Sequence, residues 1–477
     1  MARAVAGQSE DALRQALYGI VQRDRATRER SARFLSRRGE RDAIPALIDA
    51  LRYRPFRTAA LLDALRSLSG EDFGSGYEPW AEWMVRAEVR GPSIYRRWKA
   101  DFLARLDLRF GDLLDPARPH TIAYEEIRWG GVRAEGIPSL DEPRVVPAAQ
   151  AGYLSADELV FGAVMSPEAA ASSRKSSKVG GSVGRDAGQL PAAARAYPLR
   201  ILDWHELTND TLGSVPVALS YCTLCGSGIL FDRRVGDRLF TFATSGLLYR
   251  SNKLMFDRQT ETLWSNLTGE PVVGPLVGEG IRLRVLPLVV TTWGAWKQQH
   301  PETTVLSLET GYERDYTPGQ PYGEYFASPA TMFPVGVRDE RLSPKAWVYG
   351  IRIGEAAVAF ELSALQTAGV VNTVVGGKGV VLVTGAGRAV RAYLRGDRTF
   401  LPAGRQEGGI VAQEEQAAVP AGPTVKLVAS DGTRWRLTDL ALTEERGSDR
   451  LQRLPGHLAY WFGWYAFFPA TELWQGE

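Results

Sequence analysis

The chain has 477 residues, of which 44% are hydrophobic, 10% aromatic and 23% charged, and this ordinary globular composition predicts two to four domains. The formal net charge of +2 creates no strong field for nucleic acid or an acidic membrane. No apolar stretch of about 18 residues is present, so we expect no membrane span. Because the net charge is small, we also expect no nucleic-acid partner. Residues 1–10 lack the apolar core of a signal peptide, which predicts a cytoplasmic protein as written, or an exported one if the N-terminus is truncated.

Residues 1–115 have a helical pattern. Apolar residues recur at spacings of three and four in 43–51 and again in 59–68, and turn residues end each stretch. Short helices of this kind bury their apolar faces by stacking on neighbours, and the region resembles a small HEAT-type array. A plain helical bundle packed on the rest of the chain is the alternative. Such a scaffold would offer a surface to a protein partner.

After a linker at 116–136, the sequence changes to short β-rich runs that are separated by Gly and Pro, and these runs repeat. The motifs 196–199, 209–213, 231–240 and 293–303 recur in the same order as 359–362, 372–376, 393–400 and 461–471. We therefore predict an α+β protein in which the helical region is followed by two tandem, pseudo-repeated, mainly antiparallel β-rich modules, at 137–335 and 340–477. The first module carries a Ser-, Ala-, Gly- and Lys-rich insertion at 166–190, for which we predict a flexible surface loop.

Both cysteines of the chain lie close together, in the stretch 217–231. Side chains of a strand alternate between its two faces, so Cys222 and Cys225 can meet only on a turn, and Gly226 and Gly228 supply the necessary backbone freedom. The pattern predicts a strand, a turn that carries the thiols and a returning strand. Two neighbouring thiolates can share a soft metal ion or form a reducible disulfide.

The second copy of the repeat keeps the scaffold but lacks the reactive groups. In the repeat alignment Cys222 falls opposite Thr384, Cys225 opposite Gly387, His205 opposite Ala368 and Glu206 opposite Gly369. This difference favours a functional role for these groups in the first copy. Their replacement by ordinary core packing in the second copy is the alternative.

His205 is the candidate third metal ligand, because it follows a strand-like run and precedes a turn signal, where a loop residue could face the cysteines. Two thiolates and one imidazole suit a three-coordinate copper(I), or a zinc ion with an open fourth position. Glu206 and Asp210 are then candidate catalytic residues that move protons or orient the imidazole. A satisfied core or surface histidine is the alternative for His205, and an inert structural pair is the alternative for Cys222 and Cys225.

Longer motifs resemble a known family. The segments 194–210, 221–227, 245–249 and 257–264 are similar to a prokaryotic family named domain of unknown function 3179, and the likeness covers about residues 136–477. The chain departs from that family in its insertion at 166–190 and in the lack of an export signal. The family name records no function, so the resemblance implies little about activity.

The leading hypothesis from the sequence is a metal-dependent enzyme, an oxidoreductase that uses copper or zinc bound by Cys222, Cys225 and His205, with a small-molecule or protein substrate. One alternative is a non-enzymatic metal-binding or scaffold protein. A second alternative is a metal-free dithiol/disulfide redox protein. A redox Cys-x-x-Cys motif usually opens a helix, whereas a strand-like run at 229–231 follows the motif here.

Overall fold

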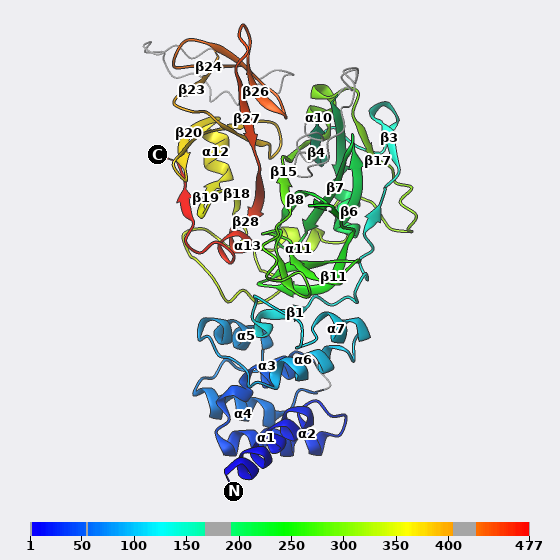
Figure 1. The fold of residues 1–477 in the computed structure, drawn as a ribbon, viewed down its shortest axis with the longest axis vertical. Helices are drawn as coiled ribbons and strands as arrows, with labels where there is room; N and C mark the ends of the chain where they lie inside the picture. The colour runs from blue at the N-terminus through cyan, green and yellow to red at the C-terminus, as the bar shows by residue number, and fades with distance from the viewer. Residues whose placement is uncertain (1, 54–55, 167–191, 404–425, 477) are drawn as a thin grey trace.

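The computed structural model describes residues 2–53, 56–166, 192–403 and 426–476. The N-terminal helices form one end of the molecule, and two β-rich parts stand side by side beyond them (Figure 1). The predicted α+β class, helices followed by mainly antiparallel sheets, is confirmed. The insertion predicted at 166–190 lies, from position 167 onward, outside the described residues, and the domain boundaries stay predictions.

The N-terminal region is helical, as predicted, whereas its likeness to a HEAT array stays a prediction. Three of its helices begin at side chains that accept a hydrogen bond from the first turn, Asp24, Thr58 and Asp107. The helices are α1 (Ala2–Gly19), α2 (Arg25–Arg38), α3 (Ile44–Arg52), α4 (Ala59–Ser69), α5 (Tyr77–Arg86), α6 (Tyr95–Leu103) and α7 (Leu108–Leu113). Their apolar faces share one core with the first sheet of the β-rich part, so this region packs directly on that sheet.

The first β-rich part contains three five-stranded sheets. The sheet beside the helices has the order β1-β11-β12-β13-β14, a second sheet has the order β15-β8-β7-β6-β2, and a third has the order β16-β4-β5-β17-β3. Strands β7 and β8 are buried over nearly their whole length, which explains why their sequence is a continuous apolar run rather than an alternating one.

The strands of this part are β1 (Ile127–Trp129), β2 (Leu140–Asp141), β3 (Val145–Pro147), β4 (Leu159–Met165), β5 (Ala193–Pro198), β6 (Leu207–Leu212), β7 (Val215–Cys222), β8 (Ser227–Asp232), β9 (Arg234–Val235), β10 (Arg238–Leu239), β11 (Phe242–Tyr249), β12 (Asn252–Asp257), β13 (Leu263–Ser265), β14 (Pro271–Val273), β15 (Arg284–Leu286), β16 (Val289–Thr292) and β17 (Thr304–Leu306). Its helices are α9 (Leu199–His205), α10 (Trp293–Gln299) and α11 (Gly323–Ala327). Helix α11 lies in the long connection to the second part.

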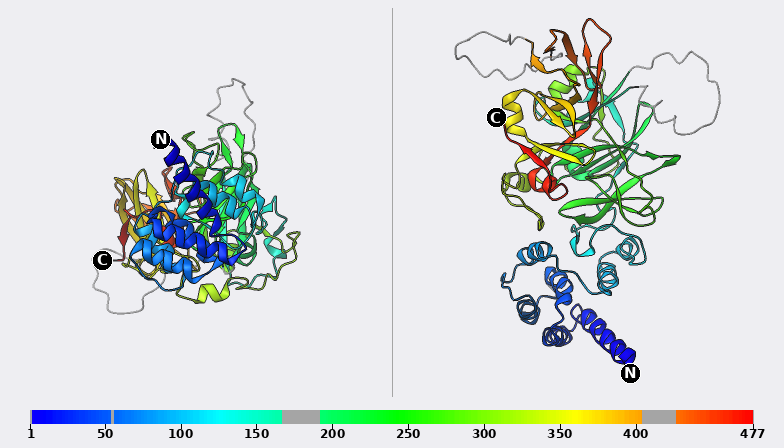
Figure 2. Two further views of the ribbon diagram at one scale, coloured as in Figure 1. Left: turned by 90° about the horizontal axis from the view of Figure 1, so that it is seen from below. Right: turned by 60° about the vertical axis from the view of Figure 1, so that its left-hand side comes forward.

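The second β-rich part contains a four-stranded sheet, β28-β18-β19-β29, and an eight-stranded sheet, β20-β21-β22-β27-β26-β25-β24-β23. Its strands are β18 (Trp347–Ile353), β19 (Ala356–Glu361), β20 (Val370–Val375), β21 (Lys378–Thr384), β22 (Val390–Leu394), β23 (Phe400–Pro402), β24 (Lys426–Ala429), β25 (Arg434–Leu437), β26 (Ala441–Glu444), β27 (Arg450–Leu454), β28 (Gly456–Tyr460) and β29 (Glu472–Trp474). Its helices are α12 (Leu362–Ala368) and α13 (Trp461–Tyr465). Figure 2 shows this part lying against the first one from two further directions.

The two β-rich parts repeat one structural unit. In the first, β16, β4, β5 and β17 are neighbours in that order, and in the second the same places are taken by β28, β18, β19 and β29. The indole N–H of Trp296 donates to the hydroxyl of Thr303 at 2.9 Å, and Trp464 makes the same bond to Thr471 at 2.9 Å. The internal duplication is therefore present in the packing as well as in the sequence.

The repeat alignment requires one correction at the cysteine hairpin. The N–H of Tyr221 binds the carbonyl of Glu206 at 2.7 Å, and the N–H of Thr384 binds the carbonyl of Gly369 at 2.9 Å. Thr384 therefore corresponds to Tyr221, and the predicted pairing of Thr384 with Cys222 is wrong by one residue. The reason is that the loop of the second copy is one residue shorter, since Thr384 pairs with Val390 whereas Tyr221 pairs with Gly228, so the one-residue gap belongs inside this loop and not before Cys222.

Candidate functional site

The two cysteines lie where β7 turns into β8, as the sequence predicts. Cys222 ends β7 opposite Ser227, the first residue of β8, and the N–H of Cys225 binds the carbonyl of Cys222 at 3.2 Å. Gly226 closes the turn with a left-handed φ of 63°, and a Cβ at this position would collide with the ring of Trp347. The turn therefore needs glycine both for its conformation and for the close approach of the second β-rich part.

Cys225 is fully buried between the two β-rich parts. Its S–H lies 3.1 Å from the carbonyl oxygen of Ser251, which belongs to the tight turn between β11 and β12. On the other side, a Cβ added to Gly463 of α13 would lie 2.9 Å from the Cβ of Cys225 and 3.2 Å from its sulfur. The N–H of Tyr460 binds the carbonyl of Cys225 at 2.7 Å, so the second part directly closes this side of the site.

Cys222 is the thiol that is poised to ionise. Burial by itself raises its pKa, but the neighbouring Cys225 side chain, the backbone N–H of Lys253 and the positive charge of the Lys253 side chain lower it, so the pKa lies below the ordinary value. Burial and the neighbouring Cys222 sulfur raise the pKa of Cys225 well above the ordinary value. The pair therefore has one thiolate-forming sulfur and one sulfur that keeps its proton.

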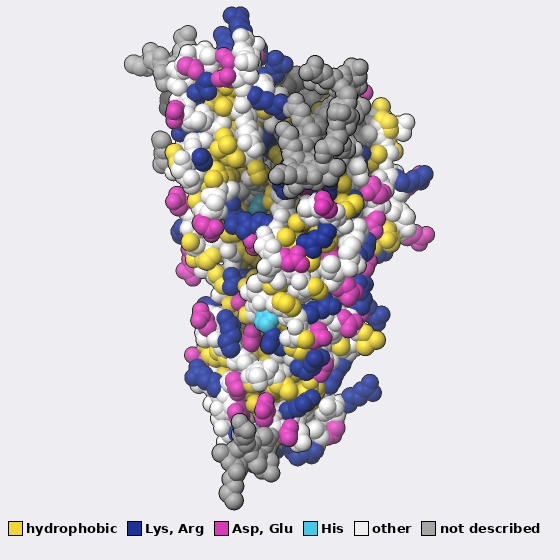
Figure 3. Space-filling view, viewed as in Figure 1, with side chains coloured by type: hydrophobic (Ala, Val, Ile, Leu, Met, Phe, Trp, Pro, Cys, Tyr) yellow, Lys and Arg dark blue, Asp and Glu magenta, His cyan; other side chains and the backbone are white. Residues whose placement is uncertain are grey.

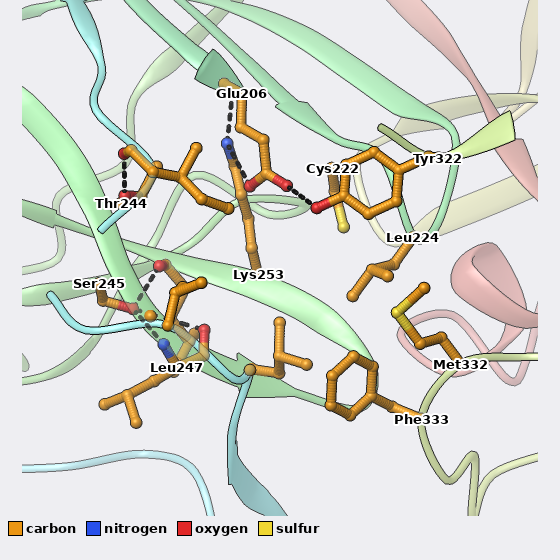
Figure 4. A pocket seen from close by; sticks show the side chains of 16 residues that line it. Glu206, Cys222, Leu224, Thr244, Ser245, Leu247, Lys253, Tyr322, Met332 and Phe333 are labelled. Atoms are coloured by element: carbon orange, nitrogen blue, oxygen red, sulfur yellow. Dashed lines mark hydrogen bonds and ion pairs between the residues drawn. The ribbon is translucent and has the colours of Figure 1, made fainter. Parts of the chain in front are cut away.

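Cys222 lines a small cavity, whereas Cys225 does not. The cavity has a volume of about 50 Å³ and lies between the first β-rich part, its N-terminal connection and the segment around α11. Its lining residues are Gly130, Val132, Ile137, Glu206, Cys222, Leu224, Thr244, Ser245, Gly246, Leu247, Leu248, Lys253, Leu254, Tyr322, Met332 and Phe333. Figure 4 shows Glu206, Cys222 and Tyr322 close together, with Met332 and Phe333 toward another end. A space of this size holds a few water molecules or a ligand of a few non-hydrogen atoms.

Glu206 points its carboxyl group toward the cysteine end of the cavity. Its Oε1 accepts a hydrogen bond from the hydroxyl of Tyr322 at 3.3 Å (Figure 4) and another from the hydroxyl of Thr223 at 3.0 Å. Burial raises its pKa, so the protonated form is favoured more than for an exposed glutamate. Glu206 adopts a left-handed φ of 55°, where its counterpart in the second copy, Gly369, has a φ of 72°. The first copy thus keeps a strained, non-glycine residue at a position where glycine is the unstrained choice.

Lys253 is a cavity residue that the sequence pattern did not predict. Its Nζ donates to the backbone carbonyl of Glu206 at 2.5 Å and lies 3.8 Å from Glu206 Oε2. Burial lowers its pKa to about 8, against the opposing effect of the Glu206 carboxylate. The only sequence signal was a lysine directly before the apolar run 254–256 of strand β12, and Tyr322 had no signal of its own.

The predicted Cys2His metal centre is not formed. Among the residues that the structure describes, no group of three or more His, Cys, Asp or Glu side chains is arranged to hold a metal ion. His205 Nδ1 lies 2.8 Å from the carbonyl oxygen of Pro138, to which it must donate, and Nε2 lies 2.6 Å from the hydroxyl of Tyr316. Both ring nitrogens thus have partners of their own at the end of α9, and burial lowers the pKa of the ring, which favours this neutral form.

Asp210, the second predicted proton-handling residue, lies on β6 away from the cavity lining. Its carboxylate is bound by the guanidinium of Arg195 at 2.5 Å and by the hydroxyl of Tyr197 at 2.7 Å. This side chain has the partners of a structural ion pair, and of the two predicted proton-handling residues the structure brings only Glu206 to the thiols.

The described helices include none that is long and apolar enough to cross a membrane. Lys and Arg side chains are interspersed with Asp and Glu over the face seen in Figure 3, in agreement with the small net charge. No curated protein and no solved structure matches the chain. A family model described as "Protein of unknown function (DUF3179)" matches residues 189–471, more than half of the sequence, so the chain belongs to the DUF3179 family.

Proposed function

We propose that this protein is a dithiol/disulfide oxidoreductase that acts on a small molecule bound beside Cys222. The observation that carries the proposal is the asymmetry of the two thiols. Cys222 lines the cavity and its pKa is lowered, while Cys225 is buried behind it, outside the lining, and donates its S–H to the carbonyl oxygen of Ser251 at 3.1 Å. Such a pair has the two parts that thiol redox chemistry needs, an attacking thiolate and a resolving thiol.

The reaction transfers two electrons from the dithiol to the substrate. The Cys222 thiolate attacks an electrophilic atom of the substrate and expels a leaving group, which takes up a proton. The Cys225 sulfur then displaces the substrate atom from Cys222, and its own proton is released. The products are the reduced substrate and a Cys222–Cys225 disulfide, which a thiol reductant from outside the protein returns to the dithiol.

Glu206 is the proposed proton donor and acceptor in these steps. Its carboxyl group lines the same cavity as Cys222 and is held by Thr223 and Tyr322. A buried carboxyl group with a raised pKa can carry a proton near neutral pH and release it to a leaving group. No helix follows the cysteines to lower the pKa of a thiol, but the neighbouring Cys225 side chain and Lys253 lower the pKa of Cys222 instead.

The test is a thiol titration of the native chain, equilibrated against a graded series of reduced and oxidised dithiothreitol. We expect one reversible intramolecular disulfide between Cys222 and Cys225, seen as the loss of both thiols, and no such step in Cys222→Ser or Cys225→Ser. Two thiols that stay reduced across the whole series would refute the proposal. Metal analysis of the same preparation separates the alternative: copper or zinc bound in a one-to-one ratio, and lost in both variants, would replace the dithiol mechanism with metal binding by the two sulfurs.

A further inference from the structure

We propose that the oxidising substrate is a small hydroperoxide, hydrogen peroxide or a short-chain alkyl hydroperoxide. This inference rests on the proposed function and narrows its substrate. The cavity at Cys222 limits the size of the substrate, because its volume is only about 50 Å³. A peptide-sized disulfide cannot place its sulfur atoms against Cys222 in this space, whereas a molecule of a few non-hydrogen atoms fits.

The cavity has a polar inner end and an apolar outer end. The inner end holds Cys222, Glu206 and Lys253, all of which are buried. The outer end is formed by Met332, which is 47% exposed, together with the half-buried Phe333. A polar O–O group at the inner end and a hydrogen or short alkyl group toward Met332 would match this arrangement (Figure 4).

The polar side chains of Glu206, Lys253 and Tyr322 line the same cavity as Cys222. Attack on a peroxide develops negative charge on the leaving oxygen, which needs a proton or positive donors close to the thiolate. The carboxyl group of Glu206 and the hydroxyl of Tyr322 contact each other at the cavity wall, and the ammonium group of Lys253 lies 3.8 Å from that carboxyl group. These three groups come from α9's C-terminal end, the α11 segment and β12, so they converge only in the folded chain.

The reaction balances with the two thiols alone. The Cys222 thiolate attacks the terminal oxygen of ROOH, the O–O bond breaks, and RO⁻ takes a proton to leave as ROH, with a sulfenic acid on Cys222. The Cys225 thiol then attacks this sulfur and displaces water. The net change is one dithiol and one ROOH converted to one disulfide, one ROH and one H2O. A thiol reductant from outside the protein closes the cycle.

The test uses the variant Cys225→Ser, in which the reaction stops at the sulfenic acid on Cys222. Dimedone then traps this acid and labels Cys222. The probes are hydrogen peroxide, ethyl hydroperoxide and oxidised glutathione. We expect dimedone labelling of Cys222 with both peroxides, at a rate about a hundredfold above that of the same variant unfolded in urea, which is the size of a general-acid contribution. Glutathione should add to Cys222 no faster in the folded variant than in the unfolded one.

Two further variants sharpen the result. Glu206→Gln keeps the shape of the side chain and should slow the peroxide reaction about a hundredfold, whereas the exposed Glu302→Gln should leave it unchanged. Met332→Trp narrows the outer end and should slow ethyl hydroperoxide more than hydrogen peroxide.

The outcomes distinguish the two proposals. A reversible Cys222–Cys225 disulfide in dithiothreitol buffers, combined with a peroxide rate equal to that of the unfolded chain, would overturn the hydroperoxide assignment and leave the dithiol function standing. Faster glutathione addition in the folded state would also overturn it, because the cavity would then admit a large disulfide. If no disulfide forms in the dithiothreitol titration, both the dithiol function and the hydroperoxide assignment are refuted.

Discussion

Replacing Gly463 with alanine tests whether the second β-rich part closes the thiol site. The added Cβ would lie 2.9 Å from the Cβ of Cys225 and 3.2 Å from its sulfur, which is closer than packed carbon atoms approach. Both sides are constrained, since Cys225 sits in a tight turn and Gly463 lies within α13. Overpacking of this kind costs about 1–3 kcal/mol, and the better helix propensity of alanine returns up to about 1 kcal/mol. We therefore expect a net loss of about 1–2 kcal/mol.

The assay combines thermal unfolding with thiol alkylation. A loss of this size lowers the unfolding temperature by several degrees, on the scale of about 2–4 °C per kcal/mol for domains of 150–250 residues. Because the alanine pushes α13 away from Cys225, iodoacetamide should modify Cys225 faster in Gly463→Ala than in the native chain, as followed by mass spectrometry. The matched control is Gly152→Ala, where an added Cβ has open space and no thiol is near. Unchanged unfolding temperature and unchanged alkylation in Gly463→Ala would show that α13 does not cover the dithiol.

Two further predictions concern buried charge outside the site. Asp49→Asn should lower the free energy of unfolding by about 3 kcal/mol in urea titrations, because it leaves the buried Lys99, 3.1 Å from Asp49, and the buried Arg128 without their shared carboxylate; a loss below about 1 kcal/mol would contradict this. Burial lowers the pKa of His457 from 6.5 to about 4, so on acidification the unfolded chain binds a proton at this histidine before the folded chain does. The free energy of unfolding should therefore fall by about 3 kcal/mol as the pH drops from about 6.5 to about 4. His457→Leu should remove that component of the pH dependence, and an identical acid profile in the variant would assign it to other groups.

The local sequence pattern was sufficient to predict the fold class and the turn that carries the two cysteines. The helical spacing of 43–51 and 59–68 and the Gly-bounded apolar run around Cys222 are short-range signals, and each depends only on neighbours along the chain. The duplication was also visible, because both copies must bury the same strands and the same tryptophan. The alignment failed by one residue at the hairpin, since a turn can lose a residue without changing the strands that flank it.

The composition of the site depended on tertiary contacts. The sequence placed Glu206 and the two cysteines correctly in one module, but it joined His205 to them, and the structure instead gives that ring to Pro138 and Tyr316. Adjacent residues at the end of a short helix point in different directions, so sequence proximity to Glu206 did not bring His205 to the sulfurs.

What the sequence by itself determined is therefore the scaffold: the helices, the paired modules and the turn that brings two thiols together. What only the tertiary structure decided is which groups surround those thiols. Lys253, Tyr322 and Gly463 come from a strand, a connecting segment and a helix that are distant along the chain and meet at Cys222 and Cys225 in space. The physical reason is that backbone pattern is fixed by local sterics and burial, whereas the chemistry of a buried sulfur is set by whichever side chains the packing of separate elements brings into contact.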